Sequence, residues 1–89
     1  MRCVITVIGK DMVGILADVS NICKGCNVNI VDVSQSIFQD MFCMIMMAYV
    51  TNSNVDFSVL SDKLTAYGKE NGLSIHAMHE DIFNSMHRI

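Results

Sequence analysis

The chain has 89 residues, of which 52% are hydrophobic and 17% charged, and its formal net charge is −3 at pH 7. That length suits one domain, and the six scattered Lys and Arg residues exclude the basic groove by which proteins bind nucleic acid. A domain this small cannot bury so much apolar surface by itself, so we expect some of it to meet a partner.

Three features of the sequence favour a soluble, cytoplasmic protein. The longest apolar run, residues 41–50, is too short to span a bilayer, so we expect no membrane partner. Lys10 and Asp11 interrupt the apolar N-terminal stretch, which argues against a signal peptide. Without such a signal, the four cysteines are interpreted as reduced thiols.

The chain begins with a predicted strand and a predicted amphipathic helix. Residues 2–8 are rich in β-branched side chains, which favour a strand, and Gly9 is expected to end it. From Val13 onward, apolar residues recur at helical spacing and predict a helix. Gly25 is expected to stop that helix in the left-handed conformation. The predicted apolar face of the helix consists of Ile15, Leu16, Val19, Ile22, Cys23 and Cys26.

Two strands with different patterns follow. Residues 28–38 have mixed faces, whereas residues 41–50 are apolar on both sides, and Gln39-Asp40 forms a polar turn between them. Gln35 is interpreted either as a satisfied core amide or as an interface contact. The third strand is rich in methionine, which we interpret as core packing in preference to an adaptable binding surface. These methionines are Met41, Met44, Met46 and Met47.

A capped helix, a strand and a terminal helix complete the chain. The run Asn52-Ser53-Asn54 predicts a turn and the cap of a helix that reaches about Gly68, with Gly72 beyond its end. Residues 73–79 alternate in polarity, as a strand does. The terminal helix, residues 80–89, has acidic side chains in its first turn and basic ones in its last, which suits the helix dipole.

The order β-α-β-β-α-β predicts the α+β, ferredoxin-like fold, a four-stranded antiparallel sheet in the order 4-1-3-2. Two helices are expected on one face of the sheet, together with a short C-terminal helix. We expect residues 1–89 to form one domain, with a core at 1–79 and the C-terminal helix at 80–89. The other face of the sheet needs a cover, for which a second copy is the simplest candidate and the terminal helix the competitor.

The loop at residues 9–14, Gly-Lys-Asp-Met-Val-Gly, is the most informative feature. It is not a phosphate-binding P-loop, because Ile15 and Leu16 follow Gly14 where Lys and Ser or Thr are required. A glycine there leaves the helix-start amides open to a carboxylate, and Asp11 beside them can take an ammonium group, so an α-amino acid suits both. Alternatively, Asp11 only caps the helix and Gly14 only lets the helix approach the sheet closely.

Other chemistry is less favoured by the sequence. Cys23 and Cys26 form a Cys-x-x-Cys pair at the helix C-terminus, where the dipole raises thiol pKa; we interpret them as core residues, with a metal or redox protein as the weaker alternative. His76 and His79 should point to opposite faces of a strand and share no ion. We see no nucleophile with a recognisable histidine partner, so we expect no enzyme, no catalytic residue, no metal and no cofactor.

The stretch Gly-Lys-Asp-Met-Val-Gly-Ile-Leu-Ala-Asp-Val-Ser at 9–20, followed by Gly-Cys-Asn-Val-Asn-Ile at 25–30, resembles the ACT domain. It looks most like the small stand-alone ACT proteins of bacteria and archaea, and it is similar to the ACT halves of the glycine cleavage system repressor. The resemblance covers nearly the whole chain. It implies a non-catalytic regulatory module that forms side-by-side homodimers, binds an amino acid or similar small ligand at their interface and signals to a partner protein.

The resemblance also implies a pocket shared between two subunits. Asp11 and Gly14 of one subunit would meet Asn29 and Ile30 of its neighbour, although Asn29 can also simply end a turn. The full expected ligand-binding set is Asp11, Met12, Val13, Gly14, Ile15, Leu16, Asn29 and Ile30. The alternative function is a ligand-free interaction or dimerisation module whose open sheet face or terminal helix docks a partner.

Overall fold

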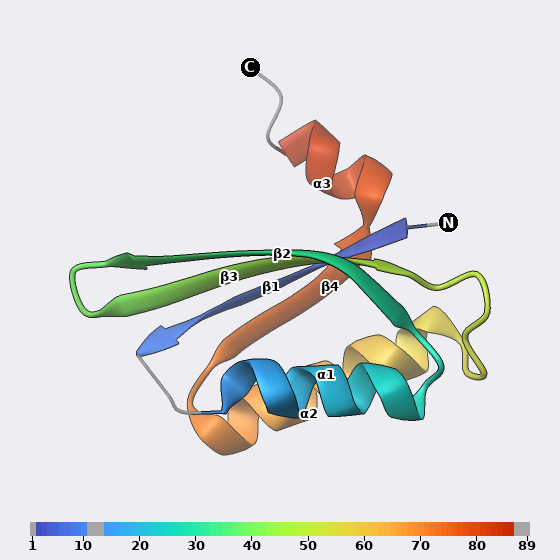
Figure 1. Ribbon diagram of the computed structural model, residues 1–89, viewed down its shortest axis with the longest axis horizontal. Coiled ribbons are helices and arrows are strands. Elements are labelled where there is room, and N and C mark those ends of the chain that lie inside the picture. The colour runs from blue at the N-terminus through green and yellow to red at the C-terminus, as the bar shows by residue number, and fades with distance from the viewer. Residues whose placement is uncertain (1, 11–13, 87–89) are drawn as a thin grey trace.

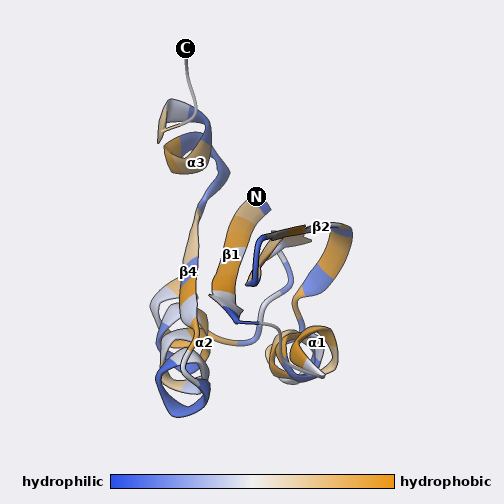
Figure 2. Cartoon of the chain, turned by 90° about the vertical axis from the view of Figure 1, so that its left-hand side faces the viewer, coloured by the Kyte–Doolittle hydropathy of each residue, from blue (hydrophilic) through white to orange (hydrophobic). Residues whose placement is uncertain are grey.

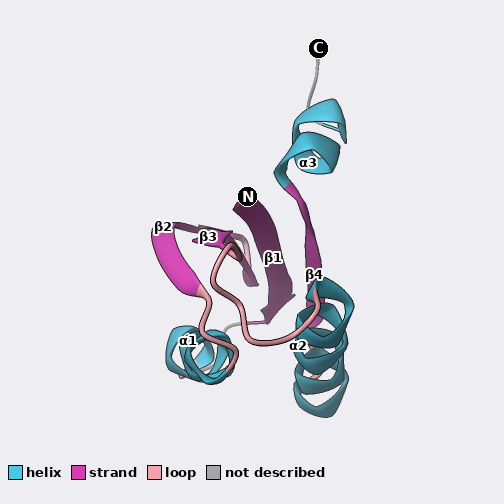
Figure 3. Cartoon of the chain, turned by 90° about the vertical axis from the view of Figure 1, so that its right-hand side faces the viewer, coloured by secondary structure: helices cyan, strands magenta, loops and turns pink. Residues whose placement is uncertain are grey.

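The computed structural model describes residues 2–10 and 14–86, which form a four-stranded antiparallel sheet with two helices on one face and a third on the other (Figure 1, Figure 3). The elements in chain order are β1 (Arg2–Lys10), α1 (Ile15–Gly25), β2 (Asn29–Phe38), β3 (Met41–Tyr49), α2 (Phe57–Asn71), β4 (Ser74–His79) and α3 (Glu80–Met86). The strand order β2-β3-β1-β4 is the predicted order 4-1-3-2 read from the other edge, so the ferredoxin-like prediction is confirmed.

The sheet face that carries α1 and α2, called the inner face below, holds the core. Side chains of β1 and β3 alternate between the two faces, and those pointing inward are fully buried. The inward residues with 0% exposure are Cys3, Ile5 and Val7 of β1 and Met44, Met46 and Ala48 of β3. Figure 2 shows the resulting apolar character of β1, which lies in the middle of the sheet.

Two expectations about the sheet are only partly correct. Met44 and Met46 are core residues as predicted, but Met41 is 40% exposed because it faces outward at the far end of β3. Gln35 is exposed, so the core-amide interpretation is wrong. It points to the inner side opposite Met44, but β2 is the edge strand and leaves it uncovered.

The two glycines around the first loop have different structural roles. The strand continues through Gly9 to Lys10, so Gly9 does not end it. A side chain at Gly9 would collide with Leu73, so this glycine lets β1 lie close to the start of β4. Gly14 has a φ of 86°, and a Cβ added there would meet no atom within 4 Å. Its left-handed backbone, and not a close helix–sheet approach, therefore accounts for the glycine.

The end of α1 differs from the prediction. Gly25 stays helical, and the left-handed residue is Asn27, with a φ of 57°. The chain must carry Cys26 into the core, where it is 1% exposed, before it can turn toward β2. Asparagine tolerates the left-handed conformation better than most residues, which lowers the energetic cost of the later turn.

The start of α2 also differs. The helix begins at Phe57 after Asp56 and runs to Asn71, with Gly72 as its left-handed cap, so the predicted cap at residues 52–54 is wrong. These residues instead fasten the loop to the end of α1. The backbone N–H of Asn54 donates to the carbonyl of Cys26 over 3.0 Å, and its side chain donates to Gly25 over 3.3 Å. Helix C-termini leave carbonyls without helical partners, and this loop supplies donors for two of them.

The opposite face, called the outer face below, is covered at one end only. α3 lies there against β1 and β4, and Arg2 forms an ion pair with Glu80 at the start of the helix (Figure 1). No residue of α3 within Glu80–Met86 is buried. Residues 87–89 of the predicted terminal helix lie outside the described part. Within the described part, no helix is both long and apolar enough to cross a membrane.

Candidate functional site

Among the described residues, no side chain caps the backbone amides at the start of α1. The first helical hydrogen bond runs from Asp18 N–H to the Gly14 carbonyl over 2.9 Å, so the N–H groups of Ile15 and Leu16 precede it in the helix. At the N-cap, Gly14 is exposed and has no side chain to bond these groups. Such amides, together with the positive end of the helix dipole, favour a carboxylate.

The predicted loop residues contribute to this end in different ways. Ile15 is 2% exposed and anchors the helix in the core, so only its backbone can reach a ligand. Leu16 is 39% exposed and adds an apolar side chain beside the open amides. Asp11, Met12 and Val13 lie outside the described residues, and their assignments, including Asp11 as a helix cap, stay predictions.

A hydrogen bond between the two inner helices fixes the position of this helix start. The Tyr67 hydroxyl of α2 donates to Oδ2 of Asp18 over 2.6 Å. Partial burial, and then this bond and the charge of Asp18, raise the pKa of Tyr67 to about 12, because each disfavours the phenolate. Tyr67 therefore stays protonated at neutral pH and holds the first turn of α1 in place.

Asn29 and Ile30 line a cavity of about 520 Å³ at the other end of α1. That volume falls in the range of small-molecule sites. Most of the lining residues are polar, and several carry side-chain amides that can donate and accept hydrogen bonds. The cavity is lined by Ser20, Asn21, Lys24, Asn27, Val28, Asn29, Ile30 and Asn52.

The structure explains how this cavity is built. Asn27 takes the left-handed conformation at the turn into β2, and its side-chain amide donates to the Asn52 carbonyl over 2.7 Å. This bond holds Asn52 beside the end of α1, where it lines the cavity. Lys24 brings a positive charge to the opposite wall from the last turn of the helix. A carboxylate or an amide would find complementary partners here.

Most of the cavity lining was missed by reasoning from the sequence. Ser20, Asn21 and Lys24 lie on the polar side of α1, which a periodicity argument assigns to solvent. The sequence did contain a signal for this cavity. Three polar residues of α1, at spacing i, i+1 and i+4, precede asparagines at positions 27 and 29. Asn52 had no such signal, because its place depends on a hydrogen bond across 25 residues of chain.

The two predicted half-sites do not meet within one chain. Gly14 precedes α1, whereas the cavity begins at Ser20 in the second half of the helix, so about 9 Å of helix separates the two places. α1 contacts β2, whose outer edge pairs with no other strand in the described part of the chain. The described parts of the two half-sites therefore lie apart within one chain.

The cysteines and the two described histidines, His76 and His79, form no comparable site. Cys3, Cys23 and Cys26 are buried together in the core, and burial, with the neighbouring thiols adding to it, raises the pKa of Cys23 to about 11. His76 lies opposite Thr6 and His79 opposite Cys3, which places them on different faces of the sheet, as predicted. Among the residues that the structure describes, no group of His, Cys, Asp and Glu could hold a metal ion.

Known proteins with similar sequences span the whole chain. A UPF0237 protein of Clostridium perfringens is 49% identical over 89 residues, which is 100% of both chains. A UPF0237 protein of Methanocaldococcus jannaschii is 44% identical over 88 residues, covering 99% of this chain and 98% of the relative. These names state no activity, so the relatives show sequence similarity over the whole chain but assign no ligand.

Solved structures agree on the fold. An ACT domain protein from Streptococcus pneumoniae superposes with a TM-score of 0.80 at 32% identity, over 93% of both chains. A putative glycine cleavage system transcriptional repressor matches with a TM-score of 0.73 at 25% identity, over 85% of this chain and 43% of that one. The family model described as ACT domain matches residues 2–78. The chain therefore belongs to the ACT domain family.

Proposed function

We propose that this chain is a regulatory domain that binds an amino acid or a similar small zwitterion between two copies of itself. ACT domains are typically regulatory and ligand-binding, and they commonly dimerise. The observation that carries the proposal is the separation of two complementary half-sites, the open amides at Gly14 and the cavity at Asn29 and Ile30, at opposite ends of α1.

A twofold axis beside β2 would join the half-sites. Antiparallel pairing of two β2 edges extends the sheet, and it makes the adjacent α1 helices run in opposite directions. The Gly14 end of one copy then faces the Asn29 end of the other. α1 lies under β2 in Figure 3, so the helix and the edge strand would enter the interface together.

The chemistry of the two halves suits an α-amino acid. The amides of Ile15 and Leu16 would bind its carboxylate, and Met12 and Val13, which lie outside the described residues, are further predicted contacts. Asp11 would bind its ammonium group. The partner's Asn29 would supply an amide for either group, and the partner's Ile30 would contact the ligand side chain.

A binding screen tests this proposal. Free amino acids are titrated into the purified protein by calorimetry, and thermal shifts are recorded in parallel. We expect at least one to bind below about 1 mM and to raise the melting temperature, because a ligand at a hundredfold excess over its Kd stabilises a protein by about 2.7 kcal/mol. If no amino acid binds in that range, the proposal is wrong.

Two variants separate ligand binding from simple dimerisation. Asp11→Ala should weaken binding of the identified amino acid by removing the ammonium partner, while the variant keeps its fold and its association. Val59→Glu, on the solvent side of α2, is the matched control and should bind normally. If Asp11→Ala binds as the unchanged protein does, Asp11 has no role in the site.

We further propose that the domain has no catalytic activity and no cofactor, acts in the cytoplasm and passes ligand binding to a regulated protein partner. Burial raises the pKa of the Cys23 thiol, which disfavours the thiolate needed for redox or metal chemistry, and no group of His, Cys, Asp and Glu among the described residues could hold a metal ion. A second candidate function is a ligand-free interaction module, which the half-covered outer face favours. A module of this kind would still associate with its protein partner, but no amino acid would bind to it in the calorimetric screen.

A further inference from the structure

The cavity at the C-terminal half of α1 has an apolar side and a polar side. Val28 is buried and Ile30 is half-buried, and these two residues form the apolar side. Ile30 lies opposite Ala48 of β3, which faces the inner layer. The polar side is formed by Ser20, Asn21, Lys24 and Asn52. A ligand group that fills this cavity therefore needs methylene groups for one side and a polar end for the other.

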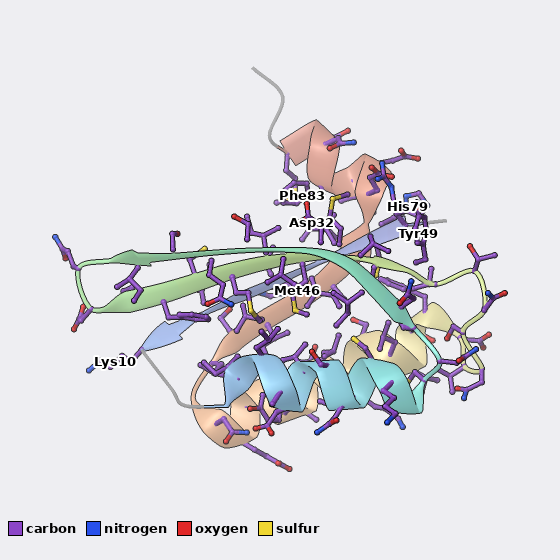
Figure 4. The ribbon with its side chains drawn as sticks, in the orientation of Figure 1. Lys10, Asp32, Met46, Tyr49, His79 and Phe83 are labelled. Carbon is purple, nitrogen blue, oxygen red and sulfur yellow. The ribbon has the colours of Figure 1, made fainter. Side chains whose placement is uncertain are left out.

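Lys24 is the one charged residue among the described residues that line this cavity. Its side chain forms no ion pair and no hydrogen bond with any described residue. Asp18 of α1 instead accepts from Tyr67, and Asp32 of β2 lies on the side of the sheet away from α1 (Figure 4). The cavity thus holds a positive charge with no negative charge beside it, which favours an anionic ligand group.

The end of α1 does not need Lys24 for its own hydrogen bonds. A lysine in the last turn of a helix often bonds the final carbonyls. Here the backbone N–H of Asn27 donates to the Lys24 carbonyl over 3.0 Å, and Asn54 donates to the carbonyls of the next two residues. The ammonium group of Lys24 is therefore available to a ligand.

The polar neighbours of Lys24 can all act as donors. Asn52 accepts a bond through its backbone carbonyl, but its side-chain amide forms no bond with another described residue. The same holds for the side chains of Ser20 and Asn21. A carboxylate only accepts hydrogen bonds, so hydroxyl, amide and ammonium donors around one cavity suit it better than they suit a cationic group.

We propose that the amino acid bound between two copies carries a carboxylate at the end of its side chain, and that Lys24 selects it. This inference rests on the proposed function, in which the amides of Ile15 and Leu16 bind the α-carboxylate. The side chain then enters the cavity of the partner. Its methylene groups contact the partner's Ile30, and its carboxylate pairs with the partner's Lys24. The ligand class is the acidic amino acids, aspartate and glutamate.

The same cavity discriminates against other side chains. A neutral amide such as that of glutamine would form ordinary hydrogen bonds, which are about half as strong as charge-assisted ones. A basic side chain would be opposed by the like charge of Lys24. A purely apolar side chain would displace water from the ammonium group without replacing its hydrogen bonds. Lys24 is therefore a specificity-determining residue.

Calorimetric titration with matched pairs of amino acids tests the ligand class. Glutamate and glutamine have nearly the same shape and differ in the charge of the side chain, as aspartate and asparagine do. We expect each acid to bind at least about tenfold more tightly than its amide, a difference of about 1.4 kcal/mol. Added salt should reduce the binding of glutamate more than that of glutamine, because it screens the ion pair.

Variants of Lys24 test which residue makes the selection. Lys24→Gln should weaken glutamate binding at least about tenfold and leave glutamine binding within about twofold, so that the preference is lost. Lys24→Arg keeps the charge and should keep the preference. Lys63→Gln, at an exposed lysine of α2, makes the same charge change far from the cavity and is the matched control. Lys24 is exposed, so folding should be unaffected, as circular dichroism will show.

The outcomes separate this inference from the proposed function. If a neutral or basic amino acid binds at least as tightly as glutamate, the acidic ligand class is wrong, while the shared amino-acid site stands. If glutamate is preferred and Lys24→Gln keeps that preference, Lys24 does not select the ligand and this inference is overturned. If no amino acid binds at all, the proposed function fails and this inference fails with it.

Discussion

The two faces of this sheet belong to the same strands, but helices cover them to different extents. On the inner face, α1 and α2 reduce the exposure of Ile5 and Met46 to 0%. On the outer face, Ile8 stays 42% exposed, although it lines a cavity together with Phe83 and Met86 of α3. The difference indicates that stability resides mainly in the inner layer, while the outer layer is free to take part in association.

The largest expected effect contrasts an inward isoleucine with an outward one. Ile5→Ala should lower the free energy of unfolding by about 2–5 kcal/mol, because it empties space in a close-packed core. Ile8→Ala should cost less than about 1 kcal/mol in the monomer, since its side chain is 42% exposed. Urea unfolding at low protein concentration measures both values. Equal losses would mean that the two faces contribute alike to stability.

A second contrast concerns two glycines in the inner layer. Gly9→Ala should destabilise the fold by about 1–3 kcal/mol, because the new methyl group would collide with Leu73. Gly25→Ala is the matched control: Gly25 is helical and a Cβ added there would meet no atom within 4 Å, so this change should be neutral or stabilise by up to about 1 kcal/mol. Thermal or urea unfolding gives the comparison. A neutral Gly9→Ala would show that Leu73 yields easily.

A smaller effect is expected at high pH. The folded pKa of Tyr67 is raised from 10.0 to about 12, so its contribution to stability is present below pH 10 and is lost as pH rises toward 12. Tyr67→Phe should therefore unfold with a weaker dependence on pH in that window. Cys23 also loses stabilisation as pH rises toward 11, but it does so in both proteins and cancels in the difference. Identical pH profiles would show that the bond to Asp18 contributes nothing.

The candidate site was predictable in part because its two halves have local causes. Gly14 begins a helix, and its left-handed backbone is a property of one residue and its neighbours. Asn29 and Ile30 start a strand that alternation already reveals. Lys24, Asn27 and Asn52 were not predicted, because the cavity that they line exists only when the loop before α2 folds back on the end of α1.

The sequence by itself determined the element order, the two central strands and the inner faces of the helices, because each depends on a periodicity within a few residues. Only the tertiary structure decided which side chain Gly9 lies against, which carbonyls Asn54 bonds and which face of the sheet α3 covers. Those outcomes rest on contacts between segments far apart in the chain, such as Asn54 with Cys26 and Gly9 with Leu73. A local pattern carries no information about which distant atoms will fill the space beside it.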